Sequence, residues 1–252
     1  MGFGLVLHKV RIMSKKESLH GFGKGVHFSI DDVLNSLLWL ENNGKNSVFE
    51  ARIFQLARWL YESYGIPTTY NCFFENERGS LRYVSDKYKK QISDAGFMFF
   101  SFHGKNPCTD YNEAGYKEAY RDYMVVLEEL KRIAGEESIS GVIRTHFFHG
   151  SKEAVEAFGD CGARLLLTAD DDRGSYDLAP AEENEARKGV YKKGNKGYLA
   201  TDIRLESVSL ERLRGNRYPS EKPIVIFTHE WYAPKEEARE KIELMLESLK
   251  GR

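Results

Sequence analysis

Short apolar runs of strand length alternate with amphipathic helical stretches along almost the whole chain. Strands that alternate with helices pair in parallel through right-handed crossovers, so this order predicts an α/β fold. The runs over residues 97–102 and 223–227 are almost entirely apolar, which is typical of strands buried on both faces. The expected strands cover residues 25–30, 68–74, 97–102, 141–148, 163–168 and 223–231, and the expected helices cover residues 34–44, 47–64, 86–95, 119–133, 151–159 and 234–250.

Several of the expected strands end in side chains suited to catalysis or metal binding. These strand ends carry Asp31 with Asp32, His103, Arg144 with His146, and His229 with Glu230. Buried apolar strands fit a barrel and a doubly wound sheet equally well. Barrel enzymes place their active sites at the carboxyl ends of the strands, where these distant residues would meet. We therefore expect one barrel domain over residues 1–252, with a polar insertion or surface loop around residues 182–198.

Composition and charge limit the classes of binding partner that the chain could have. The net charge is -1, with 37 basic and 38 acidic residues, so the sequence has no basic stripe for nucleic acid or anionic membrane. No apolar run approaches the roughly 18 residues that a membrane span needs. Residues 1–21 lack the apolar core and small-residue exit of a cleavable signal, which favours a cytoplasmic protein. Three cysteines are too few for a disulfide framework.

The adjacent carboxylates of Asp31 and Asp32 are the sharpest local feature. Two neighbouring carboxylates at a strand end repel each other unless a cation or an arginine offsets their charge. The alternative is a turn in which Asp32 caps the helix that follows. The acidic run at residues 170–172 is more simply explained as a solvated loop.

Taken together, the motifs resemble those of the polysaccharide deacetylases of the NodB type, carbohydrate esterase family 4. The resemblance spans about residues 20–232 and lies in the order of the motifs rather than in any one of them. It implies a NodB-like distorted (β/α) barrel with about seven parallel strands. The segments that carry it are HFSIDDV, YGIPTTYNCFF, DAGFMFFSFHGKNP, GVIRTHFFHG, CGARLLLTADDD and IVIFTHEW.

The resemblance also implies roles for individual residues. Asp31 would be the general base, and Asp32 and His103 would bind a divalent metal, with zinc as the expected ion. His229 would be the general acid. Arg144 would orient Asp31, and Asp171, or its neighbour Asp170, would hold His229.

One departure from the family pattern concerns the third metal ligand. The family has a second histidine four residues after the first, but Pro107 occupies that position here. His146 is a candidate, because it follows Arg144 by two residues on the expected strand and so points to the same side. His149 and Glu230 are alternatives, and a chain without tightly bound metal is another.

The resemblance implies a metal-dependent hydrolase that removes an acetyl or other acyl group from an N- or O-acylated carbohydrate or related small amide. Trp231 and Tyr232 would offer a stacking face to the sugar. One alternative is a catalytically silent barrel that binds a sugar or another small ligand. Another is an unrelated barrel enzyme with a metal at Asp31 and Asp32. The sequence leaves the oligomeric state open.

Overall fold

The computed structural model describes residues 21–215 and 222–249. The segment on which the expectation of no cleavable signal rests, residues 1–20, lies outside the described residues. The strands are β1 (Phe22–Gly23), β2 (Val26–Val33), β3 (Thr68–Phe73), β4 (Glu75–Asn76), β5 (Gly79–Ser80), β6 (Met98–Gly104), β7 (Val142–Ile143), β8 (Leu165–Thr168), β9 (Tyr191–Lys193), β10 (Lys196–Ala200), β11 (Ile203–Arg204) and β12 (Ile224–His229).

Helices flank these strands and connect them. The α-helices are α2 (Asn35–Asn42), α3 (Arg52–Tyr64), α4 (Lys89–Ala95), α5 (Tyr116–Ala134), α6 (Lys152–Asp160), α7 (Pro180–Lys188), α8 (Leu210–Gly215) and α9 (Glu236–Leu249). Short 3₁₀ turns are η1 (Val48–Glu50), η2 (Leu81–Tyr83), η3 (Glu136–Ser138) and η4 (His146–Phe148). None of the described helices has the length and apolar character required to cross a membrane.

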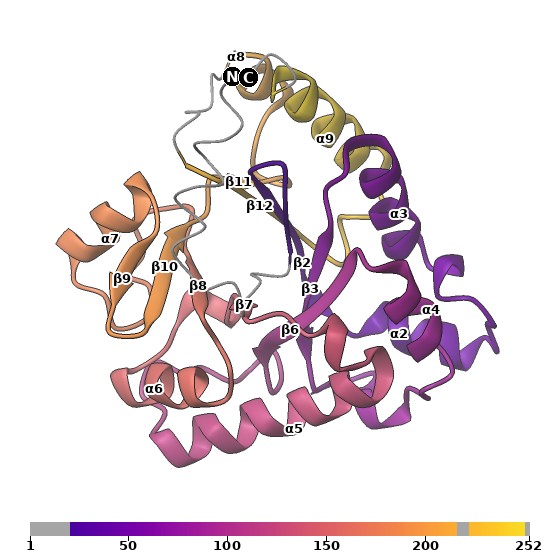
Figure 1. Cartoon of the computed structure of the whole chain (residues 1–252), viewed down its shortest axis with the longest axis horizontal. Coiled ribbons are helices and arrows are strands. Elements are labelled where there is room, and N and C mark those ends of the chain that lie inside the picture. Colours follow the sequence, from indigo (N-terminus) through magenta and orange to yellow (C-terminus); the bar gives the residue numbers. More distant parts are fainter. Residues whose placement is uncertain (1–20, 216–221, 250–252) are drawn as a thin grey trace.

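The strands lie in the middle of the molecule with helices outside them (Figure 1). The larger sheet has six strands in the order β11–β12–β2–β3–β6, with β1 antiparallel to β2. The smaller sheet has four strands in the order β7–β8–β10–β9. Every pairing within these two sheets is parallel except those of β1 and β9, which confirms the parallel α/β expectation.

The two sheets do not form one continuous closed ladder among the described residues. They meet at β6, where Phe100 forms an isolated parallel bridge with Ile139. An apolar cluster joins their facing sides, because it contains Val225 of the larger sheet together with Leu165 and Leu167 of the smaller one. The arrangement is therefore two mostly parallel sheets packed through a shared apolar cluster, and the closure expected of a barrel is not seen among the described strands.

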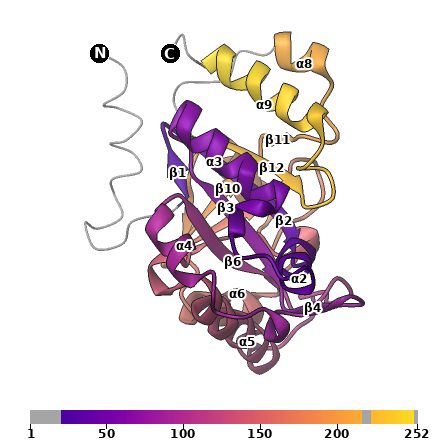
Figure 2. The ribbon, with the colours of Figure 1, turned by 90° about the vertical axis from the view of Figure 1, so that its right-hand side faces the viewer.

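Local sequence signals explain where the helices begin and end. Ser47 and Glu50 form the expected capping box ahead of α3. Gly65 and Gly96 adopt left-handed backbone just after α3 and α4, a conformation that glycine reaches without a Cβ clash. Helices α8 and α9 lie at the opposite end of the molecule from α5 and α6 (Figure 2).

Two expected segments differ from the structure. The stretch around residues 182–198 is not a surface loop: it contains most of α7 and the β9–β10 hairpin, and β10 pairs in parallel with β8. Its lysines and glutamates conceal a short buried run at residues 197–200. The strand expected over residues 141–148 is reduced to the two residues of β7, and the chain leaves the sheet before Arg144.

Candidate metal centre and active site

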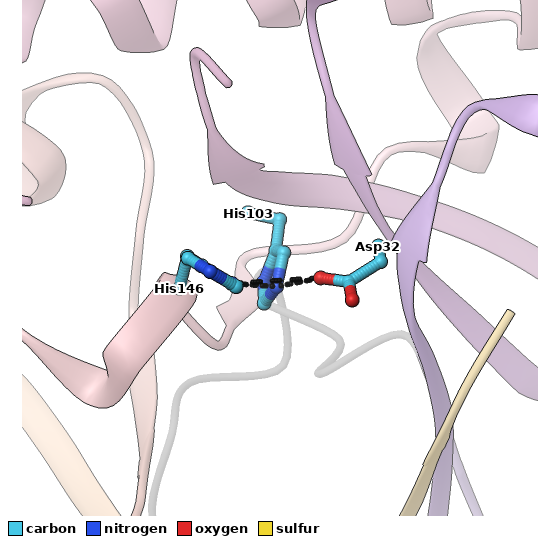
Figure 3. A group of neighbouring side chains, drawn as sticks. All are labelled: Asp32, His103 and His146. Carbon is cyan, nitrogen blue, oxygen red and sulfur yellow. Dashed lines mark hydrogen bonds and ion pairs between the residues drawn. The ribbon is translucent and has the colours of Figure 1, made fainter. Parts of the chain in front are cut away.

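Asp32, His103 and His146 converge from three separate segments of the chain (Figure 3). Asp32 lies in β2, His103 lies in β6, and His146 begins the η4 turn after β7. The Asp32 Oδ1 atom is 3.0 Å from His103 Nε2 and 3.5 Å from His146 Nδ1, and the two nitrogens are 3.3 Å apart. We call these three residues the Asp32 triad.

The second nitrogen of His103 shows which atom faces the centre of the triad. His103 Nδ1 donates a hydrogen bond of 2.5 Å to the carbonyl oxygen of Arg144. In a neutral imidazole this leaves a lone pair on Nε2, which points at an oxygen of Asp32 that is also an acceptor. Such an arrangement is stable only if His103 takes a second proton or a cation lies among the three atoms.

The triad fits a divalent metal. A carboxylate and two imidazoles are a donor set that zinc accepts at catalytic sites. Bonds of about 2.0–2.1 Å in tetrahedral geometry would separate two ligand atoms by about 3.3 Å, close to the three observed separations. A hydrogen bond behind a ligating histidine, as His103 makes to Arg144, fixes its tautomer and ring orientation.

The backbone is strained on both sides of the triad. Asp32 has φ of 62°, and the successive residues Phe147 and Phe148 have φ of 62° and 65°. This left-handed conformation is rare for a bulky residue such as phenylalanine, where it costs about 1–2 kcal/mol, and aspartate reaches it more readily. Strain of this kind gathers at functional sites. At Asp32 it coincides with the break in the β2–β3 register between Ile30 and Val33.

Charge distribution within the triad favours an ionised Asp32. Burial alone raises the pKa of a carboxyl group, but the contacts with His103 and His146 outweigh it and hold the pKa of Asp32 well below its usual range. A negatively charged oxygen is therefore present beside two imidazole nitrogens at neutral pH. This is the charge state that a cation requires.

Asp31, the other member of the aspartate pair, has different surroundings. It is buried, and Arg144 Nη1 lies 3.1 Å from its Oδ1 and 3.3 Å from its Oδ2. Arg144 is also buried and donates to Ser29 at 2.7 Å and to Thr201 at 3.1 Å. The adjacent carboxylates thus avoid mutual repulsion, since Asp31 is offset by an arginine and Asp32 faces the histidines.

Asn71 is a site residue that the sequence analysis missed. Its side-chain nitrogen donates a hydrogen bond of 2.6 Å to Asp31 Oδ1, and its oxygen accepts one of 2.8 Å from Ser101. The Asp31 carboxylate only accepts hydrogen bonds, so it fixes which end of the amide faces it, and the Ser101 hydroxyl can donate to the other end. Alternation along β3 and β6 places both side chains on the Asp31 face of the sheet, a signal that was present in the sequence.

His229 lies opposite Asp31 in the register of β12 and β2. Its Nδ1 contacts the Glu206 carboxylate, which follows β11. Burial lowers the pKa of His229, but the contact with Glu206 and the charges of Asp31 and Asp32 outweigh that effect and raise it.

The carboxylate against His229 is therefore not the expected one. Asp171 binds the guanidinium of Arg173 at 2.6 and 2.7 Å, and its neighbour Asp170 binds Arg204 at 2.7 Å. The short acidic loop satisfies its charges with nearby arginines. Glu206 reaches His229 instead because β11 lies beside β12.

The two alternative metal ligands lie elsewhere. Glu230 accepts hydrogen bonds from the backbone N–H groups of Leu34, Asn35 and Ser36, and so caps the start of α2. His149 binds Asp110 at 2.8 Å. Of the three candidates, His146 is the one that meets Asp32 and His103, although it does so from a turn rather than from the strand that was expected.

A cavity of about 660 Å³ opens beside Asp32. Trp231 lines it and is 59% exposed, so its indole is available to a ligand. Tyr232, the other expected stacking residue, is only 4% exposed, and its hydroxyl contacts Lys241 of α9. The tyrosine therefore packs beneath the rim.

No protein-family model and no curated protein matches the sequence. Solved structures do match it. A protein designated a polysaccharide deacetylase from Mycobacterium smegmatis aligns with a TM-score of 0.52 and 13% identity, over 88% of this chain and 82% of that one. A family 4 acetyl xylan esterase from Clostridium thermocellum, in complex with a cobalt ion, gives a TM-score of 0.48 and 13% identity over 90% and 84%. The Mycobacterium likeness shows a shared fold.

Proposed function

We propose that this chain is a metal-dependent hydrolase that removes an acyl group from an N- or O-acylated carbohydrate or a related small amide. The observation that carries the proposal is the position of the Asp32 triad beside the buried Asp31–Arg144 pair, with His229 next to Asp31 in the sheet register. A metal site, a fixed carboxylate and a partly exposed histidine are the parts that hydrolysis of an amide or ester needs.

Asp32, His103 and His146 would hold the metal, with zinc as the expected ion. When bound, it polarises the acyl carbonyl and increases the acidity of a water molecule. Asp31 takes a proton from that water as the water oxygen forms a bond to the acyl carbon. Arg144 and Asn71 keep the carboxylate in place during this step.

His229 completes the reaction. The bond from the acyl carbon to the nitrogen or oxygen of the sugar breaks, and His229 gives its proton to the departing group. Its Nδ1 is occupied by Glu206, so the other ring nitrogen, Nε2, is the donor. A raised pKa favours the protonated form of this histidine, which is the form that an acid needs. The products are the free acid and an amino or hydroxyl sugar.

The first test is the metal content of the purified protein, measured by plasma mass spectrometry after dialysis with excess zinc and removal of free metal. We expect about one equivalent per chain in the wild type and a small fraction of that in Asp32→Ala. Asp171→Ala is the matched control, since Asp171 pairs with Arg173 outside the triad. Its metal content should equal that of the wild type.

The second test is acetate release from a panel of N- and O-acetylated sugars by the zinc-loaded protein. Turnover that Asp32→Ala loses and Asp171→Ala retains would support the proposal. Metal in the wild type without turnover on any acyl substrate would favour an unrelated metal-dependent reaction. No metal and no turnover would favour the silent sugar-binding barrel.

A further inference from the structure

The cavity beside Asp32 has the size of a sugar site. Its volume of about 660 Å³ falls within the roughly 300–1,000 Å³ of ordinary small-molecule sites. Asp32 lines it, so a ligand in the cavity would reach the metal triad directly. Trp39 of α2 and Trp231 after β12 also line it, and they are 43% and 59% exposed. Lys45 lies over the Trp39 ring at 5.5 Å and Lys235 over the Trp231 ring at 4.9 Å, and the exposed parts of the two indoles offer flat apolar surface to a sugar ring.

The acidic side chains of this cavity already have partners within the protein. Glu230 accepts three backbone N–H groups at the start of α2. Glu50 pairs with Lys45 at 3.1 Å and accepts backbone N–H groups ahead of α3. Glu77 lies 3.6 Å from Arg78, and Asp32 belongs to the triad. Apart from the exposed and weakly paired Glu77, none of these carboxylates is left to neutralise a further cation.

Arg52 is a cationic side chain at this cavity. It is the first residue of α3, it lines the cavity, and its side chain is exposed. Across residues 21–215 and 222–249 its guanidinium has no hydrogen bond or ion pair. Arg78 lines the same cavity, and its contact with Glu77 is between two side chains that are each at least 70% exposed, so it is weak.

We propose that this cavity binds a saccharide that carries an acid group, a carboxylate or a phosphate, in addition to its acyl group. Arg52 contacts the acid, with Arg78 as a second cation, while Trp39 and Trp231 face the sugar ring. A guanidinium matches the geometry of both anions through paired N–H donors. This inference rests on the proposed deacylation and names its substrate class.

Matched substrates test the inference. N-acetylglucosamine is compared with its 6-phosphate, and an O-acetylated glucoside with the corresponding glucuronide. We expect kcat/KM to be at least about tenfold higher for one or both anionic members, as for a charge-assisted hydrogen bond. Which pair shows the preference decides between phosphate and carboxylate.

Arg52→Gln should raise KM for the preferred anionic member about tenfold and leave its neutral counterpart unchanged. Arg58→Gln is the matched control, because Arg58 lies on the same helix but covers the ring of Phe49 and does not line the cavity. Equal kinetics on both members of each pair in the wild type would overturn the inference, as would an Arg52→Gln variant with unchanged KM.

Direct binding separates this inference from the proposed function. Glucuronic acid, glucosamine 6-phosphate and glucose are titrated calorimetrically into wild-type protein, Arg52→Gln and Arg58→Gln. If no acyl substrate is turned over but an anionic sugar binds at least about tenfold more tightly than glucose, and only Arg52→Gln loses the difference, then the deacylation proposal fails and the anion site stands. Equal affinity for all three sugars refutes the anion site whatever the activity.

Discussion

The two sheets place their site residues by different physical means. In the larger sheet, β2 pairs in parallel with β12 on one side and β3 on the other, and β3 pairs with β6. Backbone hydrogen bonds along these strands fix Asp31, Asn71, His103 and His229. In the smaller sheet β7 has only two residues, so Arg144 and His146 come from irregular chain beyond it.

In the chain after β7, side-chain hydrogen bonds and a strained turn hold the site residues in place of backbone pairing between strands. Arg144 is held by Ser29, Asp31 and Thr201, of which the first two belong to the larger sheet. The η4 turn is closed by a hydrogen bond of 2.8 Å from the Thr145 hydroxyl to the carbonyl of His149. The position of His146 therefore depends on tertiary contacts and on a strained turn.

This difference has consequences for substitutions. Residues fixed by the ladder can change their chemistry without moving their neighbours, because the strand stays in register. For residues held by side-chain contacts and a strained turn, a substitution that changes the position of the side chain should also change the free energy of unfolding. We therefore expect substitutions in the larger sheet to leave folding nearly unchanged, and substitutions near His146 to affect folding as well as metal binding.

The largest effect is expected for Asp31→Asn. The amide keeps the shape of the carboxylate in β2 but cannot take a proton, so kcat should fall by about 10²–10⁴, the usual contribution of a general base. Metal content should stay near that of the wild type, because Asp31 lies outside the Asp32 triad. The measurement is steady-state acetate release together with metal analysis. A variant that retains appreciable activity would exclude Asp31 as the base.

The next effect tests both histidines of the triad as metal ligands. Loss of a residue behind a metal ligand typically costs 10–100-fold in affinity, so His146→Ala and His103→Ala should each weaken metal binding by at least about 100-fold. His149→Ala is the control, since His149 binds Asp110 outside the triad. Competition with a chromogenic chelator gives the affinities. Unchanged metal affinity in His146→Ala would remove that residue from the site.

The sequence correctly predicts much of the larger sheet, where backbone pairing fixes the residues. The alternation of apolar runs and the polar residues at their ends place Asp31, His103 and His229 at the carboxyl edges of neighbouring parallel strands, where the structure has them. The same reasoning could also have identified Asn71. In long buried strands, period-two alternation and parallel pairing determine which side chains share a face.

The other region could not be predicted in the same way. His146 was placed beside Arg144 on an assumed strand, and it meets the triad from a turn with left-handed phenylalanines instead. Glu206 was missed and Asp171 preferred, because the choice depends on which strand lies beside β12 and on which acids nearby arginines neutralise. Those are properties of the tertiary structure, and no local pattern encodes them.

A smaller effect tests the strained turn. Phe147→Gly removes a left-handed strain of about 1–2 kcal/mol, whereas Phe147→Ala loses the same ring but keeps a Cβ and most of the strain. After the entropy cost of about 0.5–1 kcal/mol for glycine, the free energy of unfolding of the Gly variant should exceed that of the Ala variant by about 0–1.5 kcal/mol. Urea denaturation measures the difference.

The same pair of variants shows whether the turn positions His146. If it does, the Gly variant should bind metal several-fold more weakly than the Ala variant, because a freer backbone must be ordered again when the metal binds. Equal metal affinities in the two variants would mean that contacts other than the φ values at Phe147 set the position of His146.

The smallest effect concerns pH. His229 must be protonated to act as the acid, and its raised pKa means that activity should fall only as the pH passes above the ordinary histidine value of about 6.5. Glu206→Gln removes a negative charge from beside His229, lowers the pKa of His229, and should move the alkaline limb of kcat/KM to lower pH. Asp171→Asn should leave the limb unchanged, because Asp171 pairs with Arg173. A shift of the alkaline limb in Asp171→Asn alone would contradict the pairing of His229 with Glu206. It would support Asp171 as the carboxylate that holds His229, and would mean that the loop after β8 rearranges when substrate binds.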